Sequence, residues 1–326
     1  MLYTQHLLLG ALRGLRTKTV SYGRFTRESL RSRLHRENPI QPPKIEVLQP
    51  PYAADTIPVR PVSHLLRALG FTFAVGAGTF AVAVVSDYER QKHRVKSFFE
   101  KARSTFTQNA NEWRDLTDGD KCALYLVGAN LIVFVLWRLT NLHPMMWRYF
   151  SNSFASRSLC LPMALSVFSH YSFIHLALNM YVAWSFTNVV VDKFLGPDQF
   201  WAFYITAGVV SSLFGLAHKA LARSPIRAVG ASGAILGVLG YTCMKIPEAR
   251  LRIVFVPGFD FSAQSAIIGI ILFDLAGLLF RFRMFDHAAH LGGTLFGVFY
   301  AMIGDDLIWN RYGGYIEQAY KRLKNG

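Results

Sequence analysis

The chain has 326 residues, of which 52% are hydrophobic and only 17% are charged. Soluble domains average roughly 25% charged residues, and here the apolar residues gather in runs of about 20, long enough to cross a hydrocarbon core of roughly 30 Å. This composition excludes a simple soluble globule and excludes disorder over most of the chain. The three cysteines (Cys122, Cys160 and Cys243) are scattered and include no CxxC pair, so they predict neither a disulfide framework nor a zinc site.

Much of the net charge of +15 comes from the N-terminus, where residues 1–36 contain a single acidic residue, Glu28, among many arginines. An Arg-rich, acid-poor, amphipathic start is typical of a mitochondrial targeting peptide; a basic tail drawn to anionic lipid is the alternative. A nucleic-acid partner is disfavoured, because no surface of alternating basic and aromatic residues follows. We therefore expect a targeting or disordered basic segment over 1–50 and a Pro-rich linker over 51–63.

Seven apolar segments follow the linker. The first, 64–86, predicts an extra N-terminal transmembrane helix, and the mixed-charge stretch 87–121 predicts an interfacial helix or loop. Six more spans predict an all-α polytopic membrane bundle over 122–304, ahead of a C-terminal tail, 305–326. The connections between spans are mostly short, so neighbouring helices should pack antiparallel. The six spans are 122–140, 167–191, 198–217, 229–246, 263–281 and 287–304.

The second, fourth and sixth of these spans carry polar side chains that hydrocarbon should exclude. All three spans start on the same side of the membrane, which places the polar groups near one depth. Taken singly, a membrane histidine is more often a helix–helix hydrogen bond, and a serine among small residues usually serves packing. Their joint occurrence at one depth makes them functional candidates. They are His170, His175 and Asn179 on the second span, Ser232 on the fourth, and His287 and His290 on the sixth.

Glycine spacing predicts which helices touch. Glycines three, four or seven residues apart form a stripe on one helix face, and such stripes let membrane helices approach backbone to backbone. One stripe lies next to Ser232 and the other on the face of His290, so we expect the fourth and sixth spans to pack together with these two side chains facing. The stripes are Gly233, Gly237 and Gly240, and Gly293 and Gly297.

Together these residues make a complete set for acyl transfer. A serine hydroxyl is a weak nucleophile until a positioned base takes its proton, and histidine is the usual base, so we pair Ser232 with His290. The resulting oxyanion needs preorganised donors, and His175 and Asn179 offer two from one helix face. Asp286 could orient His290, but it falls at the edge of the span, so a dyad is favoured.

Two other catalytic arrangements fit less well. A metalloprotease helix would carry HExxH, whereas His287 and His290 are separated as in HAAH. An aspartyl intramembrane protease would need two facing aspartates and a GxGD motif. Asp274 is the central one here, and we expect it to make a structural hydrogen bond, with a substrate or proton role as the alternative. No metal and no cofactor are implied.

At these residues the chain resembles the rhomboid family of intramembrane serine proteases. The motif GxSG is present at 230–233, HxxxN runs from His175 to Asn179, and AHxxG occupies 289–293. The resemblance implies a six-helix bundle with one extra N-terminal helix, in which Ser232 is the nucleophile and His290 the general base. It further assigns His175, Asn179, Ala231 and the Ser232 backbone N–H to the oxyanion and substrate-binding group, with Gly230, Gly233 and His170 in support.

The family cleaves single-pass proteins within or beside their transmembrane helices. The resemblance is strongest to mitochondrial members, through the extra N-terminal span and the KIPE and FDHAAHLGG runs. It implies a multi-pass serine endopeptidase of the mitochondrial inner membrane, acting on single-pass substrates in the bilayer in mitochondrial quality control and mitophagy. A catalytically silent rhomboid-like protein that binds or chaperones membrane helices is the alternative.

The chain departs from the family pattern at two places. Many bacterial members have a tyrosine four residues after the serine, which stacks on the histidine, whereas this chain has Leu236. The loop from Trp147 to His170 is also longer, although 147–150 is similar to a membrane-embedded loop motif. If the basic N-terminus lies in the matrix, the site faces the matrix side.

Overall fold

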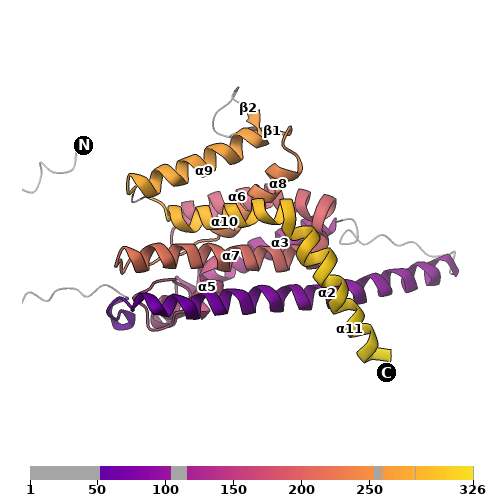
Figure 1. Cartoon of the computed structure of the whole chain (residues 1–326), viewed down its shortest axis with the longest axis horizontal. Coiled ribbons are helices and arrows are strands. Elements are labelled where there is room, and N and C mark those ends of the chain that lie inside the picture. The colour runs from indigo at the N-terminus through magenta and orange to yellow at the C-terminus, as the bar shows by residue number, and fades with distance from the viewer. Residues whose placement is uncertain (1–51, 104–115, 253–257, 259, 283, 326) are drawn as a thin grey trace, which may run out of the picture. The chain divides into compact units, whose positions relative to one another are not determined.

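The computed structural model describes residues 52–103, 116–252, 258, 260–282 and 284–325, and helices dominate these ranges (Figure 1). The predictions for residues 1–50 lie outside the described residues. Residues 52–63, expected as a Pro-rich linker, contain the 3-10 turn Ala53–Asp55 and the start of a second, Val62–His64. Backbone hydrogen bonds connect this stretch to the bundle. This part of the chain is therefore folded rather than a free linker.

The extra N-terminal helix, α2 (Leu65–Arg103), is longer than the predicted span and runs past residue 86 without a break. The boundary expected there is absent because the following residues, SDYERQKHRVKSFF, include neither glycine nor proline to end a helix. At about 1.5 Å per residue, α2 exceeds the roughly 30 Å of a hydrocarbon core, so its charged second half extends beyond the bilayer. Residues 104–115 of the predicted interfacial segment lie outside the described ranges.

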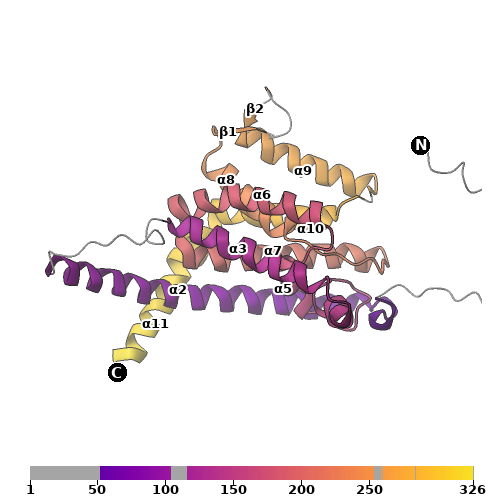
Figure 2. The same ribbon diagram turned by 180° about the vertical axis from the view of Figure 1, so that it is seen from behind.

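The predicted six-span bundle is present, and its fold class is confirmed. Each predicted span coincides with a helix whose ends differ from the prediction by up to six residues, and the helices run side by side in both views (Figures 1 and 2). Between α6 and α7 the chain passes through a π-helical turn, Val191–Leu195, to Gly196, whose φ of 70° favours glycine. The helices are α3 (Asp118–Leu136), α6 (Phe173–Val190), α7 (Gly196–Leu221), α8 (Ser232–Lys245), α9 (Ala263–Leu279) and α10 (His287–Phe299).

Within the described ranges, four helical stretches are long and apolar enough to cross a membrane: Val62–Ser97, Asp118–Leu136, Phe173–Leu221 and His287–Asn325. The third combines α6 and α7, and α9 is a shorter apolar helix. The smaller elements occupy the connections. They are the 3-10 turns Thr140–Leu142 and Ser166–Phe168, α4 (His143–Tyr149), α5 (Leu161–Leu165), and the antiparallel strands β1 (Arg250–Arg252) and β2 (Asp260–Ser262).

The C-terminal segment, expected as a tail, is helical. A π-helical stretch, Tyr300–Tyr312, continues α10 into α11 (Gly313–Asn325), which crosses α2 (Figure 1). The Tyr320 hydroxyl donates to Glu89 at 3.1 Å, and the Lys324 ammonium binds the same carboxylate. The C-terminus of the chain thus contacts the extra N-terminal helix within its charged second half.

Helices α8 and α10 approach each other closely at their backbones, as the glycine stripes predicted. A Cβ atom on Gly293 would lie 1.9 Å from the Gly233 carbonyl oxygen, and one on Gly297 would lie 2.1 Å from that of Gly237. Neither distance is compatible with a side chain. The prediction that the fourth and sixth spans pack along these glycines is therefore confirmed, and the contact sets the separation of Ser232 and His290.

Candidate active site

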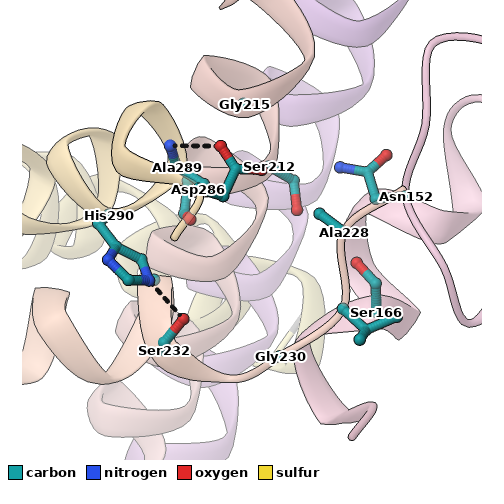
Figure 3. Close-up of a pocket in the computed structure, with 13 residues that line it drawn as sticks. Asn152, Ser166, Ser212, Gly215, Ala228, Gly230, Ser232, Asp286, Ala289 and His290 are labelled. Carbon is teal, nitrogen blue, oxygen red and sulfur yellow. Dashed lines mark hydrogen bonds between the residues drawn. The ribbon is translucent and has the colours of Figure 1, made fainter. Parts of the chain in front are cut away.

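Ser232 and His290 meet at the starts of their helices. Ser232 is the first residue of α8, and His290 lies in the first turn of α10. The Oγ atom of Ser232 and Nε2 of His290 are 2.8 Å apart, within hydrogen-bond distance (Figure 3). The structure therefore brings the two predicted catalytic residues into direct contact.

The segment leading to Ser232 requires glycine at position 230. Gly230 has a φ of 138°, a conformation that L residues avoid. A Cβ there would also lie 2.9 Å from Cε1 of the His175 ring and 3.7 Å from the Ser232 Oγ. The Gly230 N–H donates to the carbonyl of Ser166 at 3.1 Å. This glycine therefore lets the chain pass close to both His175 and the serine hydroxyl.

Of the predicted oxyanion residues, His175 lies directly against this segment. The ring of His175, on α6, is against Gly230, and Asn179 lies one turn further along the helix, where its Nδ2 donates to the His175 carbonyl at 2.8 Å. The backbone N–H of Ala231 donates to Nε2 of His170 at 3.4 Å. His170 thus supports the loop before the serine, and the Ala231 N–H is directed to His170.

Asp274 binds one histidine and lies close to a second. It is 1% exposed on α9, and its Oδ1 lies 2.8 Å from Nδ1 of His287 and 3.7 Å from Nδ1 of His290. The expected structural hydrogen bond is confirmed as the contact with His287. The approach of Asp274 to His290 was not predicted. The sequence feature that could have indicated it is a carboxylate in the middle of one span, followed by a span that opens with two histidines.

The sequence suggested that Asp286 could orient His290, but the side chain of Asp286 binds other partners. Its side chain accepts from the Ala289 N–H, which caps α10, and it forms an ion pair with Lys219 at the end of α7. Burial alone would raise the pKa of Asp286, but the Lys219 ammonium and the Ala289 N–H hold that pKa below its usual range. Lys219 was missed because the predicted span ended at residue 217. Asp286 thus fixes the start of α10.

A cavity of about 40 Å³, lined by both polar and apolar groups, adjoins the pair between α7, α8 and α10 (Figure 3). One water needs roughly 10–15 Å³ of such volume and several polar partners, so the cavity has room and partners for water. Its polar lining consists of Asn152, Ser166, Ser211, Ser212, Ser232, Asp286 and His290.

The ring of His290 packs against Phe285, a contact that the resemblance to bacterial members did not indicate. The Phe285 ring centroid lies 5.9 Å from that of His290. An aromatic neighbour therefore reaches His290 from its own helix start, although Leu236 replaces the tyrosine of many bacterial members. In the part of the chain that the structure describes, no three His, Cys, Asp or Glu side chains converge to hold a metal ion.

Fold and site together define a polytopic helical membrane protein with a Ser–His pair at the starts of two glycine-packed helices. The Rhomboid domain family model matches residues 143–305. The chain belongs to the rhomboid family.

Its similarity to individual relatives extends beyond that domain. It is 42% identical over 279 residues to the presenilin-associated rhomboid-like protein, mitochondrial, of Homo sapiens, covering 82% of this chain and 73% of the relative. It is 35% identical to Rhomboid protein 1, mitochondrial, of Saccharomyces cerevisiae (61% and 54% covered), and 31% identical to the rhomboid protease GluP of Bacillus subtilis (40% and 24% covered). With its apolar helices, the chain is a multi-pass mitochondrial membrane protein.

Proposed function

We propose that this protein is an intramembrane serine endopeptidase that cleaves transmembrane segments of single-pass proteins in the mitochondrial inner membrane. The observation that carries the proposal is the 2.8 Å contact between Ser232 Oγ and His290 Nε2, made inside a helical membrane bundle. A hydroxyl in this position transfers its proton to the imidazole as it attacks a peptide carbonyl. The imidazolium then gives that proton to the amine nitrogen as the C–N bond breaks, which releases one fragment and leaves the acyl-enzyme on Ser232.

Asp274 supports the base. Its carboxylate lies 3.7 Å from Nδ1 of His290, which favours the tautomer with the proton on Nδ1 and leaves Nε2 free to accept from Ser232. When the imidazole takes the serine proton, the same negative charge stabilises the imidazolium. His287, bound to the same carboxylate oxygen at 2.8 Å, keeps the carboxylate in place.

The tetrahedral oxyanion finds donors around the serine. Ser232 is the first residue of α8, so its N–H belongs to a helix N-terminus, where the amides are unpaired and the helix dipole is positive. His175 lies against Gly230, beside the serine, and Asn179 is on the same face of α6. We assign the oxyanion to these donors. Ala231 is retained as a substrate-binding position, because its N–H is directed to His170.

Hydrolysis of the acyl-enzyme needs a water molecule, which the cavity beside the pair has room to hold. It is lined by both Ser232 and His290, so a water held there reaches the ester carbonyl while the imidazole takes its proton. The proton passes to the departing serine oxygen, which restores the starting state. A substrate helix must first open locally, because its hydrogen bonds hide the scissile carbonyls.

The remaining assignments follow from the resemblance and the relatives. We propose that residues 1–50 are a mitochondrial targeting segment, that 64–86 and 122–304 are the extra transmembrane helix and the catalytic domain, and that the site faces the matrix side. Substrates are single-pass inner-membrane proteins whose cleavage serves mitochondrial quality control.

The experiment is cleavage of a reporter transmembrane substrate by the reconstituted full chain, wild type beside Ser232→Ala. Ser185→Ala, an exposed serine on α6, is the matched control. The proposal expects cleavage by wild type and by Ser185→Ala and none by Ser232→Ala. Equal cleavage by all three would eliminate the serine mechanism, and substrate binding without cleavage would favour the silent helix-binding alternative.

A further inference from the structure

The residues that precede α2 contact the loop that follows α4. In the segment Tyr52–Arg60, the Ile57 N–H donates to the Ala155 carbonyl at 2.8 Å, and Thr56 and Ser156 form an antiparallel bridge. Backbone pairing of this kind fixes the register of the two segments. The N-terminal segment is thus built into the same end of the bundle as Ser232.

At the centre of this contact, Asp55 and Arg227 form an ion pair. Asp55 Oδ2 lies 2.9 Å from Nη2 of Arg227, and each side chain is 7% exposed. The Ser156 hydroxyl donates to the same carboxylate oxygen at 2.5 Å. The guanidinium also lies 5.5 Å from the centroid of the Tyr52 ring. Each charge is therefore withdrawn from water and is balanced by the other.

Arg227 connects the pair to the chain that leads to the nucleophile. Its Nη1 donates to the Trp147 carbonyl at 2.7 Å and to the Ser151 hydroxyl at 2.9 Å. The next residue, Ala228, exchanges two backbone hydrogen bonds with Asn152, both of 2.8 Å. The segment that leads to Ser232 is consequently attached to α4 and to the loop after it, through the Arg227 side chain and through the backbone of Ala228.

Loss of the carboxylate would change this arrangement in a definite direction. A buried guanidinium without its counter-charge is strongly unfavourable, so Arg227 would turn toward water and release its bonds to Trp147 and Ser151. Ser232 lies five residues further on, after Gly230 with its positive φ. Displacement of a catalytic group by about 1 Å can cost a hundredfold in rate.

We propose that Asp55 is a positioning residue for the nucleophile: through Arg227, the segment before the first transmembrane helix sets the position of the 227–231 chain and hence of the Ser232 hydroxyl. This inference rests on the proposed function of Ser232. It makes the N-terminal segment part of the catalytic domain, so that a chain lacking residues 52–60 is impaired in chemistry even where the bundle is retained.

The test compares Asp55→Asn with Asp198→Asn in the reconstituted full chain. Asp198 is a matched control, since it is also a buried carboxylate paired to an arginine, Arg90 at 2.8 Å. It lies near the start of α7, roughly 20 Å along that helix from the cavity. We expect Asp55→Asn to lower kcat by about tenfold or more with little change in KM, whereas Asp198→Asn leaves kcat within about twofold. Asp55→Glu, which keeps the charge, should recover most of the loss.

Amide hydrogen exchange in 228–231 gives a readout that does not depend on activity. It should become faster in Asp55→Asn and stay unchanged in Asp198→Asn. Unchanged exchange and unchanged kcat in Asp55→Asn would overturn the proposal, as would equal losses in both variants. If wild type does not cleave the reporter, the proposed function fails and exchange alone decides this inference. If Asp55→Asn does not fold, Ser156→Ala removes one bond to the carboxylate and gives the same test at smaller amplitude.

Discussion

Nδ1 of His290 lies 3.7 Å from Oδ1 of Asp274, while Nε2 of the same ring lies 2.8 Å from the Ser232 hydroxyl. The distance to Asp274 is longer than a hydrogen bond, so the carboxylate acts on the imidazole through its charge. It moves closer to the ring when the imidazolium forms. His287 holds that carboxylate more tightly, at 2.8 Å.

Replacing Asp274 by Asn should therefore slow catalysis without removing the dyad. We expect kcat to fall by about 10- to 100-fold, less than the loss of about 10⁴ known when a directly bonded triad aspartate is replaced. Steady-state cleavage of the reporter measures it. Asp305→Asn, a carboxylate bound by Gln199 and Lys245, serves as the control and should leave kcat nearly unchanged. An Asp274→Asn enzyme with wild-type kcat would show that the carboxylate does not assist His290.

Gly293→Ala should separate the two catalytic helices. The new methyl group would lie 1.9 Å from the Gly233 carbonyl oxygen, so α8 and α10 must move apart. We expect a loss of about 3 kcal/mol in stability, together with loss of cleavage. Gly269→Ala on α9 is the matched control, since its Cβ would meet nothing within 4 Å. Thermal unfolding in detergent measures both variants, and equal melting temperatures would contradict the packing described.

Truncation of His175 tests the oxyanion assignment. If its ring donates to the developing oxyanion beside Gly230, His175→Ala should lower kcat by about 10²–10³ with a smaller effect on KM. Covalent capture of Ser232 should persist at a reduced rate, because the dyad remains. A loss confined to KM would instead indicate a role in substrate binding.

The Asp286–Lys219 pair predicts a loss of stability in acid. The pKa of Asp286 is lowered in the folded protein, so its contribution is present above the unfolded pKa of about 3.9 and is lost as the pH falls through the folded value. The melting temperature of wild type should therefore fall more steeply below about pH 4 than that of the double variant Asp286→Asn/Lys219→Met. Parallel pH profiles would show that the pair contributes nothing to this dependence.

The meeting of Ser232 and His290 could be predicted from sequence because two regular patterns encode it. Span parity places both residues at one membrane depth, and the glycines at i, i+4 and i+7 mark the faces that touch. Both patterns are local periodicities, which a single sequence displays directly.

Contacts between distant residues were not predictable in this way. Asp55 and Arg227 are 172 residues apart, and neither belongs to a periodic pattern, so only the folded chain shows that they pair. The end of the extra helix was missed because apolarity stops near residue 86 while helix-forming residues continue to Arg103. The approach of Asp274 to His290 depends on the relative rotation of α9 and α10, which hydropathy does not encode.

The most direct test of a Ser232–His290 dyad is covalent labelling of the folded protein by a fluorophosphonate, with the modified residue identified by mass spectrometry. The wild-type protein should carry an adduct on Ser232, and His290→Ala should carry none under the same conditions, because the hydroxyl then lacks its base. Equal labelling of Ser232 in both proteins, or a folded wild type that is never modified there, would contradict the account.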